Sequence, residues 1–225
     1  MVDGPLIIGV TMGDPAGIGP EIGAKLLSAR CQDQEIYPVM IGSAEALGVA
    51  LKLIGIDTHL NVLSEFDPHN LQPGAINVYD PGALNITDVV VGQLDELAGE
   101  ASMLYNRQGA ELAMTGQIHG LVTLPVTKAS TKLAGYDYPG QAEYFAKLAG
   151  NLPFTTILIY RDFRAALFTT HMPLIEACSM VNKDNLLNKI KYLHAKRLDL
   201  GFPNLRLAIA SLLSLIHIKR CRRAI

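Results

Sequence analysis

The sequence predicts an α/β fold with a largely parallel sheet flanked by helices. Short apolar runs bounded by turn residues alternate with segments of helical periodicity, an order typical of parallel sheets. Three of the runs, 6–11, 36–41 and 120–124, are apolar at nearly every position, as strands buried on both faces are. With 49% hydrophobic residues among 225, the chain has ample material for a buried core.

Helices are predicted where apolar residues recur at helical spacing or where a helix-start signal follows a strand. Pro20 and Glu21 form such a signal, because proline suits the first helical position and an acid suits the first turn. Ser43 is expected to cap the next helix and Gly55 to end it. The predicted helices are 20–29, 44–54, 88–115, a helix from about 127, 141–149 and 182–197.

The remaining segments read as strands and loops. Residues 58–80 are interrupted by prolines and are expected to hold short strands. Inside the long helical pattern, Gly92, Gly99 and Gly109 mark either breaks or close packing. Further strands are predicted at 155–160 and 165–170, joined by a hairpin turn, and at 205–210.

Composition narrows the range of partners and compartments. The formal charge of −2 argues against nucleic acid or a membrane surface as a partner. Three widely spaced cysteines form no disulfide framework and suit reduced thiols in a cytoplasmic protein. No apolar run approaches the roughly 18 residues of a membrane span, and the first residues do not resemble a signal peptide.

The segment that follows the first strand is the clearest candidate for a ligand site. It reads Thr11-Met-Gly-Asp-Pro-Ala-Gly-Ile-Gly-Pro-Glu21. Its three glycines would allow the backbone to approach a ligand closely, and the helix start would attract an anion. It matches neither a Walker A loop nor a dinucleotide fingerprint. A tight strand-to-helix connection without a ligand is the alternative, and Asp14 either binds substrate or orders the loop.

This segment resembles the N-terminal signature of the 4-hydroxythreonine-4-phosphate dehydrogenase (PdxA) family. Four further segments resemble that family in the same order, so the resemblance covers residues 6 to about 210. They are Gly92–Gly99, Gly120–Lys128, Pro139–Glu143 and Thr169–Pro173.

The resemblance implies a fold like that of isocitrate and isopropylmalate dehydrogenases. It implies NAD or NADP as cofactor, a divalent metal ion (Zn, Mg or Co), and a homodimer with a shared active site. The reaction implied is oxidation of 4-hydroxythreonine 4-phosphate followed by decarboxylation, in pyridoxal phosphate (vitamin B6) biosynthesis.

The resemblance also assigns site residues. His171 matches a metal ligand, and it follows the predicted strand 165–170, where ligands gather at strand carboxyl ends. Lys128 matches a catalytic lysine that can neutralise a phosphate or carboxylate. Asp14 is the second candidate catalytic residue. A core or capping histidine and a solvated surface lysine are the plainer alternatives for the first two.

Two departures from the family pattern qualify the predicted function. Gln141 and Ala142 stand where the family has a substrate-contacting His-Thr pair, which points to a related phosphorylated hydroxy acid such as threonate or erythronate 4-phosphate. Residues 211–225 replace a segment that carries a second metal histidine in the family. We therefore expect 1–210 to be the N-terminal portion of a PdxA-like dehydrogenase lacking its C-terminal part, and 211–225 to be an atypical basic, non-native tail.

Three functions stay open from the sequence. The first is a metal-dependent, NAD(P)-linked dehydrogenase, or a truncated, inactive piece of one. The second is a non-catalytic relative that binds phosphorylated ligands, and the third is an acyl-phosphate transferase of related fold.

Overall fold

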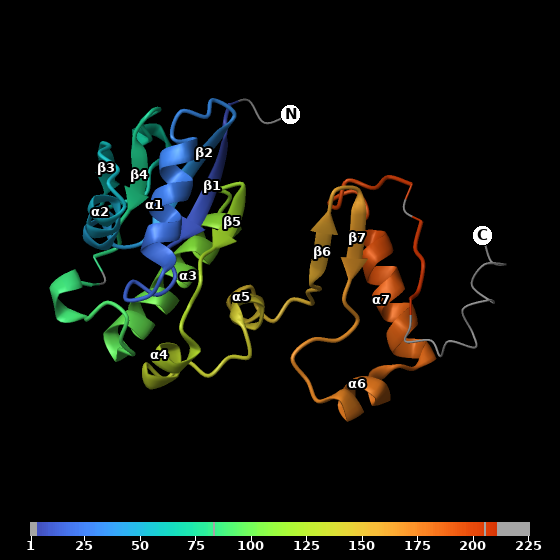
Figure 1. Cartoon of the computed structure of the whole chain (residues 1–225). Helices are drawn as coiled ribbons and strands as arrows, with labels where there is room; N and C mark the ends of the chain where they lie inside the picture. Colours follow the sequence, from blue (N-terminus) through green and yellow to red (C-terminus); the bar gives the residue numbers. More distant parts are fainter. Residues whose placement is uncertain (1–3, 83, 205, 211–225) are drawn as a thin grey trace. The chain divides into compact units, whose positions relative to one another are not determined.

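The computed structural model describes residues 4–82, 84–204 and 206–210, in two compact units, Met1–Pro153 and Phe154–Ile225 (Figure 1). The first unit holds a five-stranded parallel sheet in the order β3-β4-β2-β1-β5, so the predicted parallel α/β fold is confirmed. Its strands are β1 Leu6–Thr11, β2 Ile36–Ile41, β3 Leu60–Leu63, β4 Ile76–Tyr79 and β5 Gly120–Thr123. Its helices are α1 Gly19–Arg30, α2 Ala44–Leu53, α3 Glu96–Met114, α4 Lys128–Leu133 and α5 Gln141–Leu148, with 3₁₀ turns η1 Pro68–Asn70 and η2 Ile86–Asp88.

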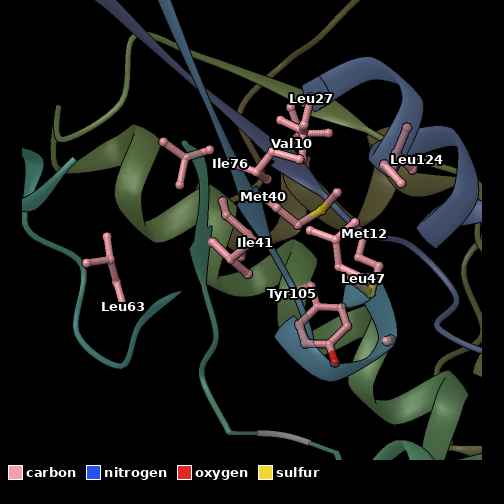
Figure 2. Packing of buried hydrophobic residues seen from close by; sticks show 14 of the residues in the cluster. Val10, Met12, Leu27, Met40, Ile41, Leu47, Leu63, Ile76, Tyr105 and Leu124 are labelled. Atoms are coloured by element: carbon pink, nitrogen blue, oxygen red, sulfur yellow. The ribbon is translucent and has the colours of Figure 1, made fainter. Parts of the chain in front are cut away.

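The central strands form the core because their side chains are apolar on both faces. Val10 of β1, Met40 of β2 and Val78 of β4 are almost fully buried. The helices add apolar side chains around them, such as Leu47 of α2 and Tyr105 of α3 (Figure 2). Burying such side chains contributes about 1.5–3 kcal/mol each, which makes this sheet the stable part of the unit.

The ends of the helices follow the predicted local signals, with one correction. The Ser43 hydroxyl accepts a hydrogen bond from the Ala46 N–H and so caps α2, as predicted. The predicted long helix does not begin at residue 88, because α3 begins at Glu96 behind the Asp95 cap. Gly92 lies before that cap with a φ of +86°, a conformation that ends helical continuity.

Two glycines inside α3 mark close packing, which was one of the two roles predicted for them, the other being a break in the helix. A Cβ on Gly99 would collide with the backbone carbonyl of Ser130, so glycine lets α3 and α4 touch. A Cβ on Gly109 would press on the side chain of Leu121 in β5. Both positions fix α3 against the elements that surround the site described below.

The second unit is smaller. Its antiparallel hairpin joins β6 Ile157–Tyr160 to β7 Phe163–Ala166, and its helices are α6 Leu174–Met180 and α7 Lys183–Ala195. The hairpin turn at 161–162 and the helix at 182–197 are confirmed, and Asn182 caps α7 by accepting from the Asn185 N–H.

Two strand predictions in the second unit are wrong. The predicted strand 165–170 stops at Ala166, because no partner continues the ladder after Leu167 donates to the Thr156 carbonyl. Residues 206–210 of the predicted strand 205–210 form no strand and are exposed. Helix α6 was not predicted. Among the described residues, no helix is long and apolar enough to cross a membrane, and the predicted tail 211–225 lies outside them.

Candidate functional site

The glycine-rich loop lies at the carboxyl end of β1 and leads into α1. A Cβ on Gly13, whose φ is +71°, would collide with the carbonyl oxygen of Pro125. A Cβ on Gly19 would collide with the carbonyl oxygen of Met12. These two glycines are therefore required by backbone contacts within the chain, as in the tight strand-to-helix connection that the sequence left open beside close approach of a ligand.

Asp14 organises this loop. Its Oδ1 accepts a hydrogen bond from the Ala16 N–H at 2.9 Å, and its own N–H donates to the Pro125 carbonyl at 3.0 Å. Its carbonyl accepts from the Gly17 N–H, and the residue is 2% exposed. Of the two roles left open by the sequence, loop ordering is the one these contacts describe, and a catalytic role stays a prediction.

A buried polar pair ties the end of β1 to α3. The Thr11 hydroxyl donates to Asn106 Oδ1 at 2.9 Å, and both residues are fully buried. A buried polar pair of this kind fixes one relative position of strand and helix, because either partner left alone would lack a hydrogen bond. The pair was not predicted from the sequence, where its one signal is a polar Asn106 on the apolar side of a predicted helix.

A cavity of about 270 Å³ lies beyond the carboxyl end of β5, among the segments that connect β5, α4 and α5. It is lined by Met103, Pro125, Val126, Lys128, Thr131, Tyr136, Tyr138, Gly140 and Gln141. The fold thus brings two predicted site residues, Lys128 and Gln141, to one cavity. Asp14 is joined to its rim through Pro125, and Ala142 is exposed and does not line it.

Gln141 connects α5 to the end of β5. Its Nε2 donates to the carbonyl of Leu124 at 3.3 Å, and its Oε1 is buried with no hydrogen-bond partner in the described part of the chain. The Nε2 contact ties the first residue of α5 to the end of β5. The predicted substrate contact by Gln141 and Ala142 remains a prediction.

The side chains of Tyr136 and Tyr138 form one wall of the cavity, and they were not predicted as site residues from the sequence. The ring of Tyr144 in α5 meets Tyr138 edge-on at 5.0 Å between centroids and Tyr136 at 6.0 Å. Burial raises the pKa of Tyr144 to about 12, so its hydroxyl stays protonated at neutral pH and can donate toward the Met103 carbonyl. The available signal was the spacing of tyrosines on either side of Asp137 before the Pro-Gly turn.

His171 belongs to the second unit. It is exposed, lies after β7 with a φ of +55°, and precedes the Pro173 cap of α6. It was predicted to follow directly after a strand, and this prediction is wrong, because β7 stops at Ala166. Within residues 4–82, 84–204 and 206–210, no group of three His, Cys, Asp or Glu side chains is placed to hold a metal ion. The metal-ligand role of His171 stays a prediction.

Comparison with known proteins agrees with the resemblance seen in the sequence. The family model described as "Pyridoxal phosphate biosynthetic protein PdxA" matches residues 34–213. A protein of Symbiobacterium thermophilum, named provisionally as a D-threonate 4-phosphate dehydrogenase, is 32% identical over 210 residues, covering 92% of this chain and 62% of its own. A 4-hydroxythreonine-4-phosphate dehydrogenase of Aquifex aeolicus is 31% identical over 192 residues, covering 85% of this chain and 58% of its own.

A solved structure shares the fold. The crystal structure of 4-hydroxythreonine-4-phosphate dehydrogenase from Klebsiella pneumoniae superposes with a TM-score of 0.83 at 27% identity, over 97% of this chain and 66% of that one. The chain therefore spans less than two thirds of the length of these relatives.

Proposed function

The chain belongs to the PdxA family, and from this membership we propose that it serves a metal-dependent, NAD(P)-linked dehydrogenase of a phosphorylated hydroxy acid. The first candidate substrate is 4-hydroxythreonine 4-phosphate, oxidised and then decarboxylated in pyridoxal phosphate biosynthesis. The second is D-threonate 4-phosphate, favoured by the relative at 32% identity and by Gln141-Ala142 in place of His-Thr. We further propose a cytoplasmic homodimer with a shared active site.

The observation that carries this proposal is the cavity at the carboxyl end of β5. In open α/β sheets, ligands bind outside the carboxyl ends of the strands, and this cavity lies there. Lys128 supplies a positive charge on its wall, which suits a substrate that bears a phosphate and a carboxylate. Asp14 and Gln141 hold the two segments that frame it.

The chemistry follows from the substrate class. Oxidation of the secondary alcohol removes a hydride and a proton, and the β-keto acid that results loses carbon dioxide. The nicotinamide, when bound, is the hydride acceptor. Within this chain, Lys128 offsets the negative charge of the bound substrate, while Met103 and the tyrosine wall keep part of it away from water.

The described residues do not by themselves form a metal site. One histidine does not hold a catalytic metal ion, which takes about three protein ligands, and the described residues offer no such group. The residues present therefore do not fit a metal site by themselves, and we derive no step through it. The role of His171 as one ligand rests on the family resemblance.

A chimera tests the proposal. Residues 1–210 of this chain would be joined to the C-terminal third of the Klebsiella pneumoniae relative, and NAD(P)H absorbance followed with each of the two substrates. We expect turnover by the chimera and little or none by residues 1–225 alone. Lys128→Met should lower kcat/KM by about 100-fold or more, in line with the loss of one charged contact in a catalytic site.

Control variants separate the alternatives. Lys25→Met removes an exposed lysine of α1 and should leave turnover unchanged, and His171→Ala should abolish metal binding by the chimera. A folded chimera that turns over neither substrate, beside an active Klebsiella relative, would contradict the dehydrogenase proposal. Substrate binding without turnover would favour the non-catalytic relative.

A further inference from the structure

Tyr138 and Lys147 form a pair at the cavity that the proposed reaction has not used. The Lys147 Nζ donates a hydrogen bond to the Tyr138 hydroxyl oxygen at 2.9 Å, and it lies 5.4 Å from the centroid of the same ring. Lys147 and Tyr144 are three residues apart on α5, so they share one face of the helix. Both of them contact the Tyr138 ring.

The contact with Lys147 decides which role is left to the Tyr138 hydroxyl. Tyr138 lines the cavity, and Lys147 is not among the residues that line it. A phenol has one proton and accepts through its lone pairs, so an oxygen that accepts from Lys147 keeps its own proton to donate to another group. A ligand in the cavity that Tyr138 lines is one such group. The hydrogen bond also raises the pKa of Lys147, which keeps the ammonium charged.

The charges around the cavity favour an anion. Of the described residues that line it, one is a lysine and none is an aspartate or glutamate. The neighbouring acids Asp137 and Glu143 lie outside the lining. A hydrogen bond to an ionised acceptor is about twice as strong as one between neutral groups, so a phenolic donor on this wall binds an anion better than a neutral group.

We propose that Tyr138, held in place by Lys147, donates a hydrogen bond to an oxyanion of the substrate in the cavity beside Lys128. Tyr138 is then an anion-binding residue, and Lys147 is a positioning residue that acts through it. The oxyanion is the phosphate or the carboxylate of the substrate, so this inference rests on the proposed function for the identity of its ligand.

The test measures binding to the 225-residue chain by calorimetry at fixed ionic strength, with inorganic phosphate, D-threonate and D-threonate 4-phosphate as probes. Tyr138→Phe keeps the ring and removes the donor, and it should weaken binding about tenfold or more. Loss confined to inorganic phosphate and D-threonate 4-phosphate assigns the phosphate. Loss confined to D-threonate and D-threonate 4-phosphate assigns the carboxylate.

The role of Lys147 is tested by a double-mutant cycle. Lys147→Met should weaken binding several-fold in the wild-type background and have no further effect in Tyr138→Phe, because it acts through the hydroxyl. Lys147→Arg should restore most of the affinity. Lys25→Met removes an exposed charge of α1 that does not line the cavity and controls for general electrostatics. Circular dichroism checks that each variant is folded.

Three results would overturn the inference: unchanged affinity in Tyr138→Phe, an effect of Lys147→Met that persists in that background, or no binding of any probe by the wild-type chain. Probe binding that depends on Tyr138, together with an inactive chimera, would leave this inference standing and remove the dehydrogenase proposal.

Discussion

The two units of this chain differ in how much of their apolar surface they bury. In Met1–Pro153, a five-stranded parallel sheet lies among helices, and side chains such as Val39, Met40 and Leu47 have no exposed surface. In the described part of Phe154–Ile225, Leu193 is the one buried hydrophobic residue. Large apolar side chains of the hairpin and of α6, among them Tyr160 and Ile175, are 68% and 81% exposed.

The difference shows that the number of helices and strands in a unit limits how much apolar surface the unit can bury. A sheet covered by helices buries its own apolar faces, whereas a two-stranded hairpin with two helices is too small to do so. A cavity of about 660 Å³ beside the hairpin and α7, lined mainly by apolar residues, shows the same shortage of packing. The first unit is therefore the stable part of the chain.

Amide hydrogen exchange should separate the units most clearly. Strands β1, β2 and β4 should exchange through global unfolding, and β6 and β7 through local opening that costs little free energy. A difference of 4 kcal/mol or more would give protection factors about three orders of magnitude apart. Equal protection in the two hairpin strands and in β1, measured by mass spectrometry, would show that the first unit is not more stable than the second.

Two glycine substitutions should act in opposite directions within the first unit. Gly99→Ala should cost about 4 kcal/mol, because the new Cβ would collide with the Ser130 carbonyl and separate α3 from α4. Gly48→Ala in α2 meets nothing within 4 Å and should gain about 0.5–1 kcal/mol. Urea denaturation measures both, and a neutral Gly99→Ala would show that the helix contact is not tight.

A matched leucine pair compares core packing. Leu47→Ala should lower the free energy of unfolding by about 3 kcal/mol, because Leu47 is fully enclosed in the core around the sheet. Leu193→Ala should cost less than about 2 kcal/mol, since one side of Leu193 already faces the large cavity. Thermal unfolding of the two variants checks the order, and a reversed order would refute it.

The two capped helices give the smallest expected difference. Ser43→Ala should cost about 1 kcal/mol, because the hydroxyl caps α2 from a buried position. Asn182→Ala should cost about 0.5 kcal/mol or less, because α7 is capped at an exposed site where water can replace the side chain. Chemical denaturation monitored by circular dichroism resolves the pair, and equal costs would argue against the role of burial.

Local signals predicted most of the first unit because they act over a few residues. Ser43 and Gly55 bound α2 as expected, and the apolar runs at 6–11 and 36–41 form β1 and β2. The second unit was predicted less well. An apolar run becomes a strand only if a partner completes its hydrogen bonds. The predicted strand 165–170 has such a partner only as far as Ala166, and residues 206–210 of the predicted strand 205–210 pair with no strand.

The candidate site shows the same division. The sequence by itself determined the family and the parallel α/β fold, because motifs and strand patterns are written in consecutive residues. It also named Asp14, Lys128 and Gln141 as candidate site residues, and their roles stay predictions. The tertiary structure alone decided that Lys128 and Gln141 share a cavity, and that Tyr138, which also lines it, accepts a hydrogen bond from Lys147. Such contacts depend on how loops and helices close around the end of β5, and no local pattern carries that information.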